Sequence, residues 1–161
     1  MESPSSGVVV VRKGNLSDST AQTSGMPRRV AISPHAGGSS RLWMGRVTGE
    51  PGMNSGPHHH GEAETCGYVL SGSCRVYYGV GFTEYVELNA GDFIYVAPFV
   101  PHIEANPNDE PCEFVTVRTP DNIVVNDLIG TGVTQVAIVD AAHLSARERR
   151  RIRIRETLDA S

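Results

Sequence analysis

Glycine and proline recur every few residues between positions 25 and 120 and divide this part of the chain into short segments. Turn-forming sequences stand at 49–52, 71–73, 89–92 and 106–111. Several short strands separated by closely spaced turns are typical of an all-β sandwich or barrel. No internal repeat is found, so the pattern predicts one barrel. The predicted strands are rich in β-branched and aromatic residues and cover 29–32, 41–47, 67–70, 74–80, 84–88, 92–97, 112–118 and 122–127.

The composition is that of a globular protein. The 161 residues are 39% hydrophobic and 20% charged, and a chain of this length suits one domain with tails. The net charge of −4 argues against a general nucleic-acid binder. No apolar run reaches the about 20 residues of a membrane helix, and the first residues do not form a secretory signal. Three cysteines without paired spacing predict reduced thiols, so we expect a cytoplasmic protein.

Three regions are predicted along the chain. Residues 1–25 form an N-terminal arm, residues 26–128 the barrel and residues 129–161 a C-terminal extension. The extension contains six arginines from position 147 onward, and Ser145 with Glu148 has the spacing of a helix capping box. We therefore expect a short arginine-rich helix, whose charges are interpreted as a solvated face in preference to a patch for an acidic partner.

A cluster of possible metal ligands lies in GPHHHGEAET, residues 56–65. Side chains alternate between the two faces of a strand, so His58 and His60 share one face and His59 points the other way. Two imidazoles side by side pack poorly but chelate metals well, and imidazole binds Zn, Fe, Cu and Ni. His59 and the nearby Glu62 are spare donors that we expect to face solvent.

Two further residues could complete this site. Glu64 follows the turn at Gly61 and could reach back toward the histidines, and an added carboxylate suits Fe, Mn or Zn. His102 follows the predicted strand 92–97 in the segment APFVPHIEAN.

These segments resemble the two motifs of the cupin superfamily. GMNSGPHHHGEAE, from Gly52, matches its first motif, and GDFIYVAPFVPHIEAN, from Gly91 to Asn106, matches its second in the expected order. The resemblance covers about residues 42–118, and the chain is similar to small single-domain cupins. It implies a jelly-roll barrel of two antiparallel sheets that holds one divalent metal per chain. The ligands it implies are His58, His60, Glu64 and His102.

The chain departs from the family pattern in both motifs. Seven residues separate Glu64 from Gly72 where the family has six, and the alternative position for the acid falls on Thr65, which has no carboxylate. A β-bulge after Glu64 would absorb the extra residue, and a three-histidine site is the alternative. In the second motif, Ala97 stands in place of proline and Phe99 in place of glycine.

An inward-facing Glu64 would bring every second residue of its strand into the barrel. Tyr68 then becomes a candidate catalytic residue, together with Tyr95 on a neighbouring strand. A bulge near Glu64 would reverse this assignment. The residues predicted to line an apolar, partly aromatic pocket are Trp43, Cys66, Phe93, Phe114 and Arg118.

Three functions are consistent with an open metal site in a barrel, and each takes a small molecule as its partner. The first is an oxidoreductase of the dioxygenase type with Fe(II), as the resemblance to oxygen-using cupins implies. The second is a redox-neutral lyase, isomerase or cyclase that uses Zn, Mn or Ni. The third is a ligand-sensing module without catalysis. Cupins commonly pair through edge strands, so we expect a homodimer in which residues 8–11 and 28–32 are candidate pairing segments.

Overall fold

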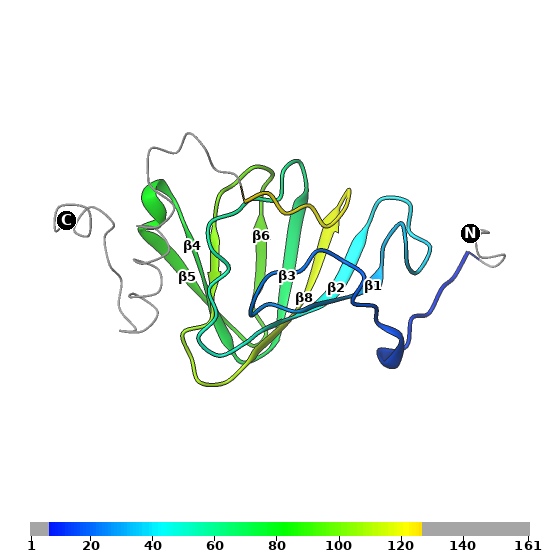
Figure 1. The fold of residues 1–161 in the computed structure, drawn as a ribbon, viewed down its shortest axis with the longest axis horizontal. Helices are drawn as coiled ribbons and strands as arrows, with labels where there is room; N and C mark the ends of the chain where they lie inside the picture. The colour runs from blue at the N-terminus through cyan, green and yellow to red at the C-terminus, as the bar shows by residue number, and fades with distance from the viewer. Residues whose placement is uncertain (1–6, 127–161) are drawn as a thin grey trace.

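The computed structural model describes residues 7–126, which form two antiparallel β-sheets that face each other (Figure 1). The first sheet has five strands in the order β1-β2-β8-β3-β6, and the second has three in the order β5-β4-β7. The strands are β1 (Arg28–Ile32), β2 (Trp43–Gly49), β3 (Glu64–Ser71), β4 (Ser73–Tyr78), β5 (Glu84–Asn89), β6 (Phe93–Val96), β7 (Ile103–Ala105) and β8 (Cys112–Thr119). Two 3-10 turns, η1 (Lys13–Asn15) and η2 (Val80–Phe82), complete the described elements.

The apolar core lies between the sheets because alternate residues of the strands point inward. One cluster is formed by Met26, Val30, Trp43, Val47 and Met53, and another by Val69, Cys74, Val76, Leu88 and Cys112. Phe114 of β8 packs against both clusters and joins them. The three cysteines are unpaired, as the sequence predicts.

The all-β fold predicted from the turn pattern is confirmed, with two differences in the strands. Seven of the predicted runs overlap the strands from β1 to β6 and β8. The run 122–127 forms no strand over its described residues; Val125 makes only an isolated bridge to His59. Strand β7 is absent from the prediction; its three residues lie within the second motif, directly after His102. The expected C-terminal helix within 129–161 lies outside the described residues.

The predicted bulge exists, but at the opposite end of its strand. Along β3 and β8 the register is regular from Glu64 to Val69 and shifts between Val69 and Ser71. The extra residue before Gly72 is therefore absorbed beside Leu70, far from Glu64. As a consequence, Thr65 and Val69 are buried while Glu64 is exposed, which reverses the facing expected from the motif.

Residues before β1 pack along the edge of the five-stranded sheet. Ser17 forms a bridge to Val30, and the Gln22 side chain exchanges hydrogen bonds of 2.8 Å with the backbone of Arg28. β1 is an end strand of its sheet, and pairing of two chains through it stays a prediction. Between residues 7 and 126, no helix is long and apolar enough to cross a membrane.

The turn at Gly72 gives a direct test of this register. Gly72 has φ of +73°, and a Cβ atom there would lie 2.4 Å from the carbonyl oxygen of Pro111. We expect Gly72→Ala to lower the free energy of unfolding by about 3 kcal/mol or more, from backbone strain plus the clash. Gly52→Ala is the matched control, because Gly52 has φ of +71° but a Cβ atom added there would have nothing within 4 Å. Equal losses in urea unfolding of the two variants would contradict the close approach at Gly72.

Candidate metal centre

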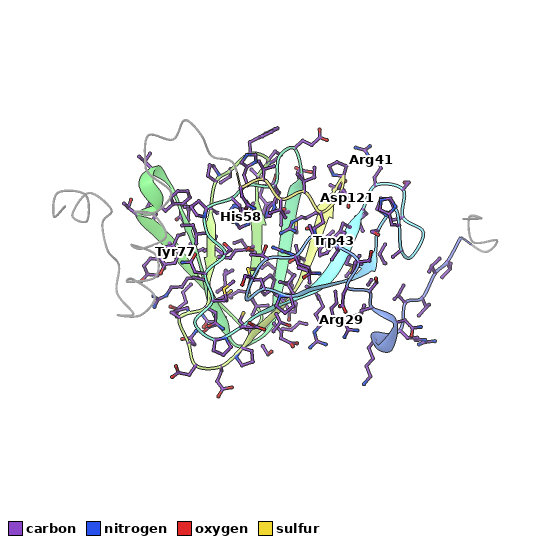
Figure 2. All side chains as sticks on the ribbon, viewed as in Figure 1. Arg29, Arg41, Trp43, His58, Tyr77 and Asp121 are labelled. Carbon is purple, nitrogen blue, oxygen red and sulfur yellow. The ribbon has the colours of Figure 1, made fainter. Side chains whose placement is uncertain are left out.

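Backbone pairing brings the two histidine motifs together. The His58 N–H donates to the His102 carbonyl over 3.0 Å, and the His102 N–H donates back over 2.9 Å. On the other side, His59 and Val125 exchange backbone hydrogen bonds of 3.0 and 2.9 Å. The histidine segment is thus held between the second motif and residues 123–125, inside the body of the fold where Figure 2 labels His58.

The imidazoles of His58, His60 and His102 converge. All three side chains are buried, their ring centroids are 4.4 to 5.0 Å apart, and one ligand atom from each lies within 4.8 Å of the others. His59 is only half-buried, and its Nδ1 accepts the Gly61 N–H at 2.9 Å. The facing predicted for the three consecutive histidines is therefore confirmed.

Backbone carbonyls set the same tautomer in all three imidazoles. The Nδ1 atoms of His58, His60 and His102 lie 3.1, 2.7 and 2.9 Å from carbonyl oxygens of Gly56, Ile123 and Val100. A carbonyl only accepts hydrogen bonds, so each Nδ1 carries the proton. Each Nε2 therefore presents a lone pair, which is the arrangement that a metal-binding histidine requires.

Burial keeps the rings of His58 and His60 neutral. It lowers the pKa of His58 to about 4, against an opposing effect of Glu104. The pKa of His60 falls to about 2, from burial first and then from the nearby Arg118 guanidinium. Neutral imidazoles at neutral pH are ready to donate a lone pair.

Two charged side chains lie against the histidines. The Glu104 Oε2 atom is 3.5 Å from His58 Nε2, and Arg118 Nη2 donates to His60 Nε2 over 3.1 Å. Burial raises the pKa of Glu104, but the positive charge around it, including the guanidiniums of Arg28 and Arg118, offsets this and lowers it to about 2. Burial lowers the pKa of Arg118 to about 10, so the carboxylate and the guanidinium are both charged at neutral pH.

Sequence reasoning misses Glu104, although a signal for it exists. Glu104 follows His102 by two residues, and residues two apart on a strand share a face. The relation applies only once β7 is recognised as a strand. Arg118, by contrast, is among the predicted pocket residues; it lies against His60, 2% exposed, with its Nε 3.2 Å from Thr65 Oγ1 and a further hydrogen bond to Asn122.

The structure does not bring Glu64 to the histidines. Its side chain is exposed and accepts a hydrogen bond of 3.0 Å from the hydroxyl of Tyr95, a residue that is 56% exposed. Cys66 is also exposed, and the ring of Tyr68 packs against Phe93 at a tilt of 46°, with centroids 4.6 Å apart. The inward facing predicted for Glu64 and Cys66 is therefore wrong, because the bulge lies beyond these residues. Tyr68 is 37% exposed but is also among the residues that line the interior cavity.

The other residues predicted to line the pocket lie in three different places: the core, the interior cavity and an open groove. Trp43 is buried in the core and donates from Nε1 to Thr20 Oγ1 at 3.0 Å. Phe114 lines the interior cavity as predicted, whereas Phe93 is 79% exposed, contrary to a place inside the barrel. Phe93 and Tyr95 instead border an open groove of about 670 Å³ that reaches His102.

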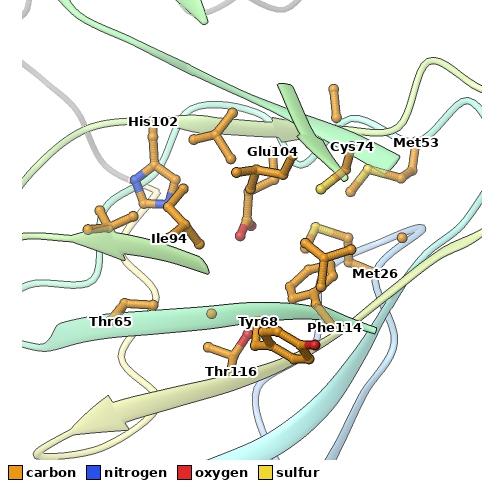
Figure 3. A pocket seen from close by; sticks show the side chains of 17 residues that line it. Met26, Met53, Thr65, Tyr68, Cys74, Ile94, His102, Glu104, Phe114 and Thr116 are labelled. Atoms are coloured by element: carbon orange, nitrogen blue, oxygen red, sulfur yellow. The ribbon is translucent and has the colours of Figure 1, made fainter. Parts of the chain in front are cut away.

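The interior of the fold also connects to the histidines. Figure 3 shows His102 and the Glu104 carboxylate pointing into an internal cavity whose opposite wall includes Thr116 and Phe114. The remainder of this wall is mainly apolar, with Met26, Met53, Val69 and Ile94 among its residues. Because His102 lines both the groove and this cavity, the histidine cluster stands between the solvent side and the interior.

The donor set fits a divalent metal. Three imidazoles and an adjacent carboxylate are the ligands that Fe, Mn, Co or Zn bind. The buried His58 Nε2 and Glu104 Oε2 atoms have no hydrogen-bond partner among the described residues, so a cation would satisfy both. A three-histidine group that could hold a metal ion is therefore present.

Comparisons with known proteins agree with this architecture. Residues 45–118 match the family of the cupin domain. Polyketide cyclase RemF from Streptomyces resistomycificus superposes with a TM-score of 0.65 at 19% identity, over 82% of this chain and 98% of that one. A Klebsiella pneumoniae protein with a double-stranded β-helix domain gives 0.53 at 24% identity, over 66% and 90%.

A third structure, oxalate decarboxylase from Bacillus subtilis, gives a TM-score of 0.56 at 25% identity. The match covers 65% of this chain but only 28% of the decarboxylase. No curated protein matches the sequence. At these identities the first two likenesses support the fold alone.

Proposed function

Because this chain carries a domain of the cupin superfamily, we propose that it is a metal-dependent enzyme acting on a small organic anion, of the Fe(II) dioxygenase type. The observation that supports a metal enzyme is the convergence of three buried Nε2 lone pairs, on His58, His60 and His102, each fixed by a backbone carbonyl. A structural metal site has all its positions filled by protein ligands, whereas this one borders an open groove.

The charge beside the histidines supports an anionic substrate. Arg118 is buried and charged, and its Nη2 donates to the same His60 Nε2 lone pair that a metal would use. Metal binding would remove that acceptor and leave the Arg118 Nη2 group directed at the metal-binding face. A carboxylate, enolate or phenolate would replace the lost acceptor with a charge-assisted hydrogen bond.

Each residue then has a definite part in binding. His58, His60 and His102 would hold the metal, and Arg118 would orient the substrate anion. Apolar side chains of the groove, such as Val86 and Val100, would cover the rest of a small organic molecule. A bound divalent metal supplies Lewis acidity and, as Fe(II), the capacity to react with oxygen.

Oxygen uptake tests the dioxygenase proposal. We expect the Fe(II)-loaded protein to consume oxygen in step with loss of an enol, phenol or acid substrate, and to be inactive without oxygen. An oxygen electrode combined with chromatography of the substrate measures both quantities. Turnover that proceeds equally well under argon would rule out the dioxygenase reaction while leaving the metal site intact.

A redox-neutral lyase, isomerase or cyclase reaction is the second candidate, and one observation favours it. The buried Arg118 and Glu104 place opposite charges beside the histidine cluster, 3.1 Å from His60 and 3.5 Å from His58. Such a pair can stabilise a developing oxyanion and accept a proton without any oxidant. Turnover with Zn(II) or Mn(II) under argon would identify this reaction class.

A further inference from the structure

The first cupin motif of this chain offers no carboxylate to the histidines. Glu64, at the position that matches the family pattern, is exposed and hydrogen-bonded to Tyr95. The adjacent inward position is Thr65, whose hydroxyl accepts from Arg118 Nε at 3.2 Å. A threonine hydroxyl does not supply the charge of a carboxylate ligand.

The second motif supplies an inward carboxylate instead. Glu104 follows His102 by two residues and shares its face of the chain, so both side chains point into the cavity in Figure 3. Ser55 holds the backbone of Glu104 through two hydrogen bonds of 2.9 Å. The Glu104 N–H donates to Ser55 Oγ, and the Glu104 carbonyl accepts the Ser55 N–H. The Glu104 side chain is 16% exposed, but its Oε2 atom is inaccessible to solvent.

Two lone pairs face each other at this point. His58 Nδ1 donates to the Gly56 carbonyl, so His58 Nε2 presents a lone pair, and Glu104 Oε2 is 3.5 Å away. Neither atom has a hydrogen-bond partner among residues 7–126. Buried acceptors without a donor are costly, and a cation between them would satisfy both. Neighbouring ligands at about 2.1 Å from one ion are about 3.0–3.4 Å apart, close to the observed separation.

We propose that Glu104 is the carboxylate ligand of the metal site, in place of Glu64. The metal ligands are then His58 and His60 from the first motif, and His102 and Glu104 from the second. This inference rests on the proposed metal-dependent function and names a ligand that the family pattern does not assign. A carboxylate added to imidazoles favours Fe, Mn and Zn over metals that prefer nitrogen ligands alone.

Metal titration of Glu104→Gln and Glu64→Gln in the full chain tests the proposal. Each protein is stripped with a chelator and titrated with Co(II) and Mn(II) in competition with a fluorescent chelator. We expect Glu104→Gln to weaken affinity at least 10- to 100-fold, and Glu64→Gln to stay within about twofold of wild type. The visible absorption of bound Co(II), which reports its ligands, should change in Glu104→Gln alone.

Three results would overturn the assignment. The first is wild-type metal affinity in Glu104→Gln, and the second is a greater loss of affinity in Glu64→Gln than in Glu104→Gln. The third is weaker metal binding in Glu104→Gln with an unchanged Co(II) spectrum, because the Glu104 charge would then act from outside the ligand shell. If Glu104→Gln does not fold by circular dichroism, Glu104→Asp keeps the charge and should bind Co(II) with an altered spectrum; an unaltered one also overturns the assignment. A wild-type protein that binds no metal would instead refute the proposed function.

Discussion

Replacing His60 or His102 with alanine is expected to remove the metal and any turnover together. One ligand atom from each of the three imidazoles converges at the site, and each alanine variant leaves two imidazoles. We expect bound metal to fall from about one ion per chain to below about one tenth after dialysis, which corresponds to at least a roughly 100-fold loss of affinity. Elemental analysis by plasma mass spectrometry measures this directly.

His59→Ala is the matched control for these variants. His59 lies in the same segment, but its ring is on the other side of the backbone, where Nδ1 accepts the Gly61 N–H. We expect its metal content and turnover to stay near wild type. If His59→Ala empties the site and His60→Ala does not, the facing of the histidine segment is reversed. Circular dichroism of all three variants checks that the barrel, whose core clusters lie elsewhere, remains folded.

The histidine cluster could be predicted because it depends on local geometry alone. The spacing of His58 and His60 places both on one face of an extended chain, whatever the rest of the fold does. The match of His102 to the second motif then identifies its partner. The positions of the strands can be predicted equally well, because turns that contain glycine and proline separate most of them.

The facing of β3 could not be predicted, since it depends on pairing with a distant strand. One extra residue before Gly72 has to be absorbed somewhere between Glu64 and Ser71, and either end is locally possible. The register with β8 decides it, because Thr65 pairs with Arg118 and Val69 with Phe114, all facing inward. A shift of one residue exchanges the two faces, which is why one misplaced bulge moves every predicted residue of this strand.

The second motif shows a different limit of sequence reasoning. Phe99 stands where the family has glycine. In the structure Phe99 itself adopts φ of 59°, and its N–H donates to the Gly61 carbonyl at 2.7 Å. The turn keeps the left-handed backbone that glycine would adopt easily, at a cost in strain for a bulky residue. The backbone requirement is thus retained by the fold, while the residue type that normally signals it is absent.

Arg118→Met is expected to weaken binding of organic anions strongly while leaving the metal in place. The guanidinium is 2% exposed and held by Thr65, Asn122 and His60, so it is a fixed cation beside the cluster. A hydrogen bond to a charged group contributes about 1.5–3 kcal/mol, which corresponds to an about 10- to 150-fold change in affinity. Methionine fills a similar space without the charge.

The metal provides a second readout for the same variant. Arg118 Nη2 donates to the His60 Nε2 lone pair, so the guanidinium competes with a metal for that atom. We expect Arg118→Met to bind Co(II) at least as tightly as the wild type. A variant that loses both metal and anion would instead mean that Arg118 supports the structure of the site and does not bind the substrate.

Calorimetry with the Co(II)-loaded protein, using oxalate and salicylate as probes of an acid and a phenol, measures the loss of anion affinity. Arg46→Met is the control, because Arg46 lies on the neighbouring strand β2 but forms a half-exposed ion pair with Glu113. Exposed ion pairs contribute little, so this variant should bind both probes as the wild type does. Equal losses in the two variants would show that overall charge attracts the anion, whereas a loss confined to Arg118→Met assigns the anion to the guanidinium beside His60.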